Sequence, residues 1–130
     1  MKAYFDEDNK LKVDIAVVGL DETVEVTASI DTGFNGYLML SLPLALSIGL
    51  KLINVLPIGF ANSTIQNKFV FDGTVLFGKK KVAVEILLTS SEESLLGTAL
   101  LQEHKLTVDW PRRTIEIIPS TQKTKTISNR

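Results

Sequence analysis

The sequence predicts a single mostly-β domain in which short strands form a barrel-like sheet, with one or two short helices. Apolar residues alternate with polar ones in many short runs, which is the pattern of half-buried strands. Only two brief stretches, near residues 41–49 and 98–104, read as helix. A length of 130 residues fits one domain, and 45% hydrophobic with 22% charged residues is ordinary for a globular fold.

The N-terminal part of the chain predicts a hairpin and a further strand. Residues 1–18 form the hairpin, because apolar residues alternate after the polar turn at residues 6–9. A second turn at residues 19–22 leads into a strand over residues 23–30. This strand is expected to end at Ile30, directly before Asp31.

A helix of about two turns is predicted after residue 40 from its end signals. Ser41 is a suitable N-cap, and Pro43 is tolerated in the first turn. Gly49 can end the helix in a left-handed conformation. So short a helix depends on tertiary packing for its stability.

The rest of the chain returns to strand character. Asn62-Ser63 is expected to be a turn between two long arms, and Asp72-Gly73-Thr74 a turn or bulge. A second short helix is expected over residues 98–104. The strands are expected over residues 51–61, 65–77, 81–89, 106–110 and 115–118.

Residues 1–118 are assigned to one domain and residues 119–130 to a flexible polar tail, because the tail has no periodicity. The net charge of −1 gives no reason to expect nucleic acid or a membrane as a partner. The N-terminal residues carry acids early and lack an apolar run, so they do not read as a signal peptide. No segment approaches membrane-spanning length, and a cytoplasmic location is the default expectation.

Asp31 stands where an apolar strand is expected to end. Apolar residues alternate along residues 24–30 up to the tripeptide Asp31-Thr32-Gly33, and the apolar run 37–40 follows the loop. A carboxylate this close to a core needs hydrogen bonds or a partner charge, because desolvation disfavours its ionised form. Gly33 lets backbones turn tightly or approach each other. This layout is typical of a chemical site.

The tripeptide in this setting resembles the active-site loop of aspartic proteases. A second marker, Leu95-Leu96-Gly97 followed by Thr98-Ala99, is similar to the family's apolar-apolar-glycine step into a short helix. Because the chain is short and holds one Asp-Thr-Gly, it resembles the single-lobed, dimeric retropepsin-like proteases, including the bacterial and archaeal clan AA members. The resemblance covers most of residues 11–118 and implies a retropepsin-like closed β-barrel, the acid protease fold.

The resemblance implies an aspartic endopeptidase that acts as a homodimer on peptide or protein substrates, without a cofactor. Asp31 from each copy would form a catalytic carboxylate dyad. Thr32 would be buried at the dimer junction and hydrogen-bond across to the partner's loop, and Gly33 would let the two loops approach. Leu96 and Gly97 would pack beneath this loop. The flap over a bound peptide would comprise Gly59, Phe60, Ala61, Asn62, Ser63 and Thr64, although an ordinary exposed hairpin explains the same residues.

Two departures from the family pattern keep other interpretations open. Phe34 stands where many relatives carry Ser, Thr or Ala, so it offers no hydroxyl to the catalytic carboxylate. Thr98-Ala99 stands where viral relatives carry an Arg-containing brace of the dimer. The alternative is a catalytically silent domain of the same fold that dimerises or binds peptides. An unrelated ligand-binding β-barrel, in which Asp31 only caps a turn, is a third interpretation.

Other polar residues carry less functional information. The chain has no cysteine, which excludes disulfides, thiol nucleophiles and thiolate metal sites. His104 is the only histidine, so no metal site is expected, and His104 is placed at the surface beyond a helix. Asp109 is expected to face solvent or to pair with a neighbour. No glycine pattern for phosphate or dinucleotide binding is present.

Overall fold

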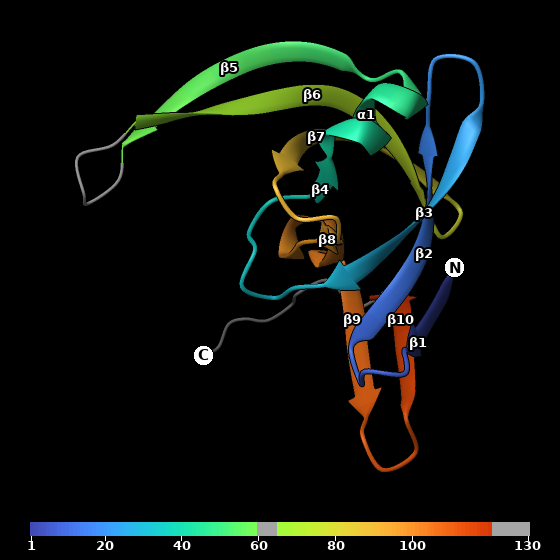
Figure 1. Cartoon of the computed structure of the whole chain (residues 1–130). Helices are drawn as coiled ribbons and strands as arrows, with labels where there is room; N and C mark the ends of the chain where they lie inside the picture. The colour runs from blue at the N-terminus through green and yellow to red at the C-terminus, as the bar shows by residue number, and fades with distance from the viewer. Residues whose placement is uncertain (60–64, 121–130) are drawn as a thin grey trace, which may run out of the picture.

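The computed structural model describes residues 1–59 and 65–120, and this part of the chain is mostly β-structure (Figure 1). One α-helix and one 3-10 helix accompany the strands. The elements are β1 (Lys2–Phe5), β2 (Leu11–Val18), β3 (Thr23–Ile30), β4 (Leu38–Ser41), α1 (Leu42–Ile48), β5 (Lys51–Gly59), β6 (Ile65–Phe77), β7 (Lys80–Thr89), β8 (Ser94–Leu96), η1 (Thr98–Leu101), β9 (His104–Asp109) and β10 (Thr114–Pro119).

Six strands close into a mixed β-barrel, which confirms the predicted fold class. The large sheet has the order β1-β2-β3-β8-β4-β7-β6-β5. A second pairing, between residues 16–18 of β2 and residues 74–76 of β6, joins the two ends of the β2-β3-β8-β4-β7-β6 series. Strands β1 and β5 extend this ring at its two ends, and β9 and β10 form a separate hairpin.

The core fills the barrel because alternate residues of each strand point inward. Val13 and Val17 of β2 are fully buried, as are Leu38 of β4 and Ile86 of β7. This alternation matches the strand pattern of the sequence, in which β2 reads Leu11-Lys-Val-Asp-Ile-Ala-Val-Val18. Burying a side chain of this size contributes roughly 1.5–3 kcal/mol, so the barrel interior is the main source of stability.

Helix α1 begins and ends as its sequence signals predict. The Ser41 side chain accepts a hydrogen bond from the Leu44 N–H, and Pro43 lies in the first turn. Gly49 adopts the left-handed conformation with φ of 82°, and its N–H reaches the carbonyls of Ala45 and Leu46. Ala45 and Ile48 are buried, so the helix is held against the barrel by its apolar side.

Strands β5 and β6 form a long two-stranded arm that reaches away from the barrel (Figure 1). The expected turn or bulge at Asp72-Gly73-Thr74 is wrong, because all three residues lie inside β6 and pair with β7. Gly73 serves packing instead. A Cβ at Gly73 would lie 2.5 Å from the Ile86 Cδ1 atom, so the glycine makes room for a core side chain of β7.

The C-terminal region differs from expectation at two points. The segment after Gly97 forms only the short 3-10 helix η1, so the helix expected over residues 98–104 is wrong in its length. His104 instead begins β9, and its Nδ1 atom is buried without a hydrogen-bond partner among the described residues. Its ring packs edge-on against Phe77 with centroids 4.8 Å apart, so His104 is not a free surface residue.

The hairpin of β9 and β10 confirms the predicted strand pair and turn. Asp109 pairs with Arg112 across this turn at 3.0 Å, in line with its expected structural role. Strand β10 extends to Pro119, and the Ser120 N–H donates to the Glu103 carbonyl. Residues 121–130 of the predicted tail lie outside the described residues. Within the described part of the chain, no helix has the length and apolarity to cross a membrane.

Candidate active site

The predicted site lies where β8 is inserted between β3 and β4. Ala28, Ser29 and Ile30 of β3 pair in parallel with residues 94–96 of β8. The other edge of β8 pairs antiparallel with β4, with Leu38 opposite Leu96. The loop over residues 31–37 therefore leaves β3, passes the end of β8 and returns along its other side. Asp31 is the first residue of this loop.

Backbone hydrogen bonds fix the position and the shape of the Asp31 turn. The Asp31 N–H donates to the Leu96 carbonyl at 2.9 Å, which extends the β3–β8 ladder by one bond. The Asp31 Oδ1 atom accepts a hydrogen bond from the Gly33 N–H at 2.9 Å. The Phe34 N–H closes the turn on the Asp31 carbonyl at 3.1 Å. The carboxylate is therefore held at the end of β3 by its own loop.

The segment after β8 holds the far side of the same loop. The Gly97 N–H donates to the Tyr37 carbonyl at 3.0 Å, and the Ala99 N–H donates to the Gly36 carbonyl at 3.1 Å. Thr98 binds the Phe34 carbonyl twice, through its N–H at 2.9 Å and its hydroxyl at 3.4 Å. Thr98 therefore braces the loop of its own chain.

The Phe34 ring fills space that two glycines leave open. A Cβ on Gly97 would lie 2.6 Å from both the Phe34 Cδ2 atom and the Phe34 carbonyl oxygen, and closer still to the Gly36 carbonyl oxygen. A Cβ on Gly36 would lie 2.7 Å from the tip of the same ring. Phe34 is half-buried. Its side chain therefore packs under the loop and against Gly97, and this apolar ring offers no hydroxyl to Asp31.

The predicted site residues fall into three groups. Asp31 and Gly33 of the loop and Leu96 and Gly97 of the supporting segment are brought together by the bonds described above. Thr32 is exposed in the single chain, so its proposed contact with a partner's loop stays a prediction. Of the flap residues, Gly59 ends β5, whereas Phe60, Ala61, Asn62, Ser63 and Thr64 lie outside the described residues.

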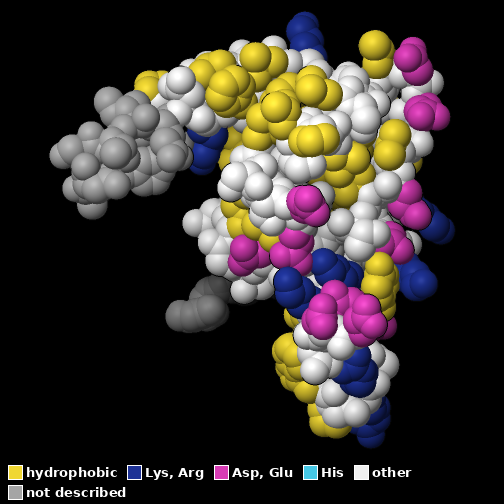
Figure 2. Space-filling model, viewed as in Figure 1, with side chains coloured by type: hydrophobic (Ala, Val, Ile, Leu, Met, Phe, Trp, Pro, Cys, Tyr) yellow, Lys and Arg dark blue, Asp and Glu magenta, His cyan; other side chains and the backbone are white. Residues whose placement is uncertain are grey.

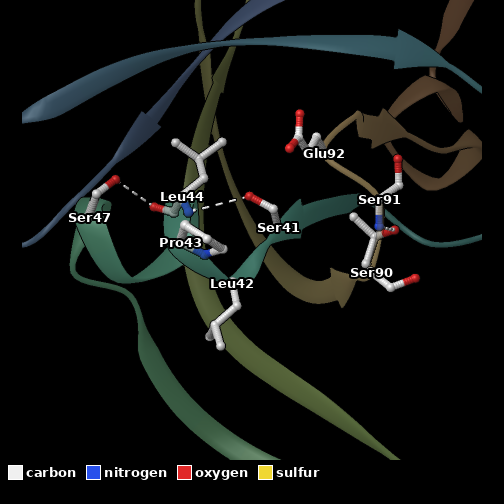
Figure 3. Close-up of a pocket in the computed structure, with 9 residues that line it drawn as sticks. Ser41, Leu42, Pro43, Leu44, Ser47, Ser90, Ser91 and Glu92 are labelled. Carbon is white, nitrogen blue, oxygen red and sulfur yellow. Dashed lines mark hydrogen bonds between the residues drawn. The ribbon is translucent and has the colours of Figure 1, made fainter.

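The hollow drawn in Figure 3 lies apart from Asp31. It has a volume of about 670 Å³ and is lined by residues 41–44, Ser47 and residues 89–92. Two of its four serines are already used by α1, since Ser41 accepts from the Leu44 N–H and Ser47 donates to the Leu44 carbonyl at 2.9 Å. Glu92 is the one acidic side chain among the lining residues, which include no histidine or lysine. Asp31 is not among the lining residues, so this hollow is separate from the predicted site.

Among the described residues, no group of three or more His, Asp or Glu side chains is arranged to hold a metal ion. Asn35 is exposed and makes no hydrogen bond to Asp31 within the same part of the chain. Asp31 has its carboxylate bonded to the Gly33 N–H, and no second carboxylate of the described chain hydrogen-bonds to it. The loop over residues 31–37 therefore holds a single carboxylate, that of Asp31.

The sequence analysis missed a cluster of polar side chains behind the Asp31 strand. Glu93, directly before β8, accepts hydrogen bonds from Lys12 of β2 and Ser29 of β3. Lys12 stands opposite Ser29 in the β2–β3 ladder. The signal in the sequence was a lysine and a serine within otherwise regular strands, but nothing local indicated that Glu93 joins them. Their contact depends on the parallel pairing of β3 with β8.

Comparison with known proteins supports this arrangement at the level of the fold. No protein-family model matches the chain, and no curated protein matches it. Among solved structures, the chain is similar to a retropepsin-like aspartic protease from Rickettsia conorii, with a TM-score of 0.62. The match covers 91% of this chain and 88% of the other, at 20% sequence identity.

The chain has the retropepsin-like fold. The similarity extends over nearly the full length of both chains. At 20% identity, the likeness concerns architecture, and the chemistry has to be argued from the residues at the site.

Proposed function

We propose that this chain is an aspartic endopeptidase that works as a homodimer, with Asp31 of each copy forming one carboxylate dyad. The observation that carries the proposal is the position of Asp31. It is the first residue after β3, hydrogen-bonded to the end of β8, in a retropepsin-like fold. Its carboxylate is oriented by a hydrogen bond from the Gly33 N–H. Thr32 and Gly33 are exposed and available to a second copy. A two-fold axis beside this loop would bring the two carboxylates together.

The proposed chemistry follows from the electrostatics of such a pair. Two carboxylates a few ångströms apart cannot both ionise, so the dyad shares one proton. The ionised Asp31 takes a proton from a water molecule as the water oxygen bonds to the scissile carbonyl carbon. The protonated Asp31 of the other copy donates to the carbonyl oxygen. As the C–N bond breaks, the newly protonated Asp31 donates its proton to the leaving nitrogen, and the other Asp31 takes a proton from a hydroxyl of the tetrahedral intermediate, so the dyad again shares one proton.

The arm of β5 and β6 is the proposed substrate cover. Its described part exposes large apolar side chains, and Figure 2 shows apolar side chains gathered along the arm. Patches of this kind on a two-stranded arm are suited to a peptide bound in extended form, with its main chain hydrogen-bonded and its side chains in apolar contacts. The exposed residues are Leu52, Ile53, Val55, Leu56 and Phe69.

A catalytically silent dimerisation or peptide-binding module of the same fold is the second candidate. The observation that favours it is Phe34, whose ring packs against Gly97 and offers no hydrogen bond to Asp31. In this case the arm would bind peptides and the Asp31 loops would only form the junction. The two candidates share the fold and the dimer, and they differ in whether a peptide bond is broken.

The direct test compares Asp31 with Asp72, because the tripeptides that they begin contain the same three residue types in a different order. The Asp31→Asn variant should lose peptidase activity on denatured protein and on a peptide library, and a statine-type inhibitor should block the unchanged enzyme. Asp72 is the matched control, because it stands in an Asp-Gly-Thr sequence, is exposed and lies in a regular strand. Asp72→Asn should keep full activity. Equal activity in both variants, or cleavage that persists in Asp31→Asn, would refute the proposal.

A mixing experiment tests whether two copies share one site. When unchanged chains exchange with an equal amount of Asp31→Asn chains, random pairing leaves activity at about half, because half of the unchanged chains then face an inactive partner. A larger excess of the variant should lower the activity further. Activity that depends only on the amount of unchanged chain would contradict a shared dyad and favour a site complete within one chain.

A further inference from the structure

Three side chains from separate segments meet beside β3, the strand that leads to Asp31. The Lys12 Nζ atom lies 2.7 Å from the Ser29 Oγ atom and 2.9 Å from the Glu93 Oε2 atom. The Ser29 hydroxyl donates to the same Glu93 oxygen. Lys10 adds a second ammonium at 3.3 Å from that carboxylate. Lys12, Ser29 and Glu93 are called the Glu93 triad below.

The triad lies next to the predicted catalytic loop in the sheet. Ser29 is two residues before Asp31 on β3, and Glu93 is the residue before β8. The backbones of these two strands pair from Ala28 with Ser94 to Ile30 with Leu96, and the next bond along is the Asp31 N–H to the Leu96 carbonyl. A side-chain link between Ser29 and Glu93 therefore ties together the two strands whose ends fix Asp31.

The burial of the triad separates it from an ordinary surface ion pair. Ser29 is 8% exposed, and the side chains of Lys12 and Glu93 are 15% and 30% exposed. By contrast, the pair of Lys80 and Glu103 has side chains that are 71% and 77% exposed, with a separation of 3.7 Å. Exposed pairs of that kind contribute little, whereas breaking a partly buried, hydrogen-bonded pair leaves a charge without its partner.

The hydrogen-bond directions argue against a nucleophilic serine. In a Ser–Lys pair that attacks a substrate, the amine must accept the hydroxyl proton. Here the Ser29 hydroxyl donates to Glu93, and Lys12 donates to both of its neighbours. The triad is therefore built to hold positions, and the Ser29 side chain is buried rather than presented to a ligand.

We propose that Glu93, together with Lys12 and Ser29, positions the Asp31 loop by fixing the ends of β3 and β8 against each other. The part of this proposal that concerns activity rests on the proposed endopeptidase function. The structural part of the proposal does not rest on that function, since it concerns only how firmly the backbone at Asp31 and Gly97 is held.

The charge environment makes this link resistant to acid. The hydrogen bond from Ser29, followed by those from Lys12 and Lys10, lowers the pKa of Glu93 to about 2. Asp6, Asp8 and Glu92 line the same surface hollow as Glu93 and are the acidic groups near it. Because the folded pKa lies below the ordinary value of 4.5, the link is complete above about pH 4.5 and is lost as the pH falls toward 2. A carboxylate dyad could therefore work in mild acid while its support stays ionised.

The test uses Glu93→Gln and Lys12→Met, with Glu103→Gln as a matched control from the exposed pair. Backbone amide hydrogen exchange at pH 6 is measured on the full chain. Both triad variants should speed exchange at Asp31 and Gly97 by about tenfold, while the amides of β9 and β10 keep their rates. Glu103→Gln should leave exchange at Asp31 and Gly97 unchanged. Unchanged exchange at these two amides in Glu93→Gln, or an equal increase throughout the chain, would overturn the proposal.

Kinetics separate positioning from simple support of the fold. For a folded Glu93→Gln enzyme, kcat should fall by about ten- to a hundredfold with KM changed far less, because displacing the carboxylates by about 1 Å disturbs the reaction more than substrate binding. Unchanged kcat would refute positioning of the reacting groups even if stability falls. If the unchanged chain cleaves no peptide, the endopeptidase proposal fails, and the exchange experiment still decides whether Glu93 orders the loop.

Discussion

Replacing Gly97 with alanine places a methyl group in the most crowded position of the candidate site. The backbone at Gly97 is extended, with φ of −101° and ψ of 178°, so alanine meets no conformational penalty there. The cost is steric, because the new Cβ would lie 2.6 Å from the Phe34 ring and from the Phe34 carbonyl oxygen. Overpacking of this kind costs about 1–3 kcal/mol, and disturbing the Gly97 and Thr98 hydrogen bonds adds about 1 kcal/mol each.

The expected loss for Gly97→Ala is therefore about 3–5 kcal/mol of unfolding free energy, measured by urea titration with far-ultraviolet circular dichroism. Protein concentration must be the same for every variant, because dimerisation would change the apparent stability. Gly78→Ala is the control, since Gly78 has φ of 65° and no atom within 4 Å of an added Cβ. It should lose only about 1–2 kcal/mol from the left-handed backbone.

A second variant tests which neighbour resists the methyl group. Phe34→Ala removes the ring but leaves the Phe34 and Gly36 carbonyl oxygens in place. The double variant with Gly97→Ala should therefore lose less stability than the two single losses added together, without full recovery. A Gly97→Ala chain within about 0.5 kcal/mol of the unchanged protein would refute this account of how the loop is packed.

Three further predictions concern the helix cap and two titrating groups. Ser41→Ala should lose about 0.5–1 kcal/mol in urea unfolding, because the Leu44 N–H loses its cap, and Ser47→Ala should lose less. The unchanged protein should lose stability between about pH 4.5 and 2 as Glu93 is protonated, and Glu93→Gln should be less stable at pH 6 with a flatter profile in this range. The pKa of His104 is lowered, chiefly by burial, so stability should also fall as the pH drops below about 6.5. His104→Phe should remove that slope in thermal melts at pH 5 and pH 8, and an unchanged slope would show that another group causes it.

Local signals in the sequence predicted the local structure well. Ser41, Pro43 and Gly49 marked both ends of α1, because capping and left-handed glycine are decided by neighbouring backbone groups. Strand β2 was predicted from alternation, since its inward residues fill the barrel. The Asp31-Thr32-Gly33 turn was located for the same reason, as a polar break between two apolar segments.

Features that depend on contacts between distant segments were not predictable. Gly73 was expected in a turn, but it lies inside β6 because Ile86 of β7 occupies the space of its side chain. The Glu93 triad requires the parallel pairing of β3 with β8, which no local pattern encodes. His104 was expected at the surface, whereas packing against Phe77 covers its ring. Each of these outcomes was decided by a neighbour from another strand.

The resemblance in the sequence supplied the fold more securely than it supplied the chemistry. The Asp-Thr-Gly loop and the Leu96-Gly97 step are close in space, joined through the Asp31 N–H and the Leu96 carbonyl. Phe34 and Thr98 depart from the family pattern, and both serve the same loop within one chain through packing and hydrogen bonding. Because the loop is supported from within the chain, the second copy in the proposed dimer has to bring in only the second carboxylate.

The measurement that tests this account most directly is the separation of the two Asp31 carboxylates in a crystal structure of the assembled protein. The account predicts a two-fold dimer in which their nearest oxygens lie about 3 Å apart, close enough to share one proton. A chain that remains a monomer at high concentration, or a dimer that keeps the two carboxylates beyond hydrogen-bonding reach, would contradict it.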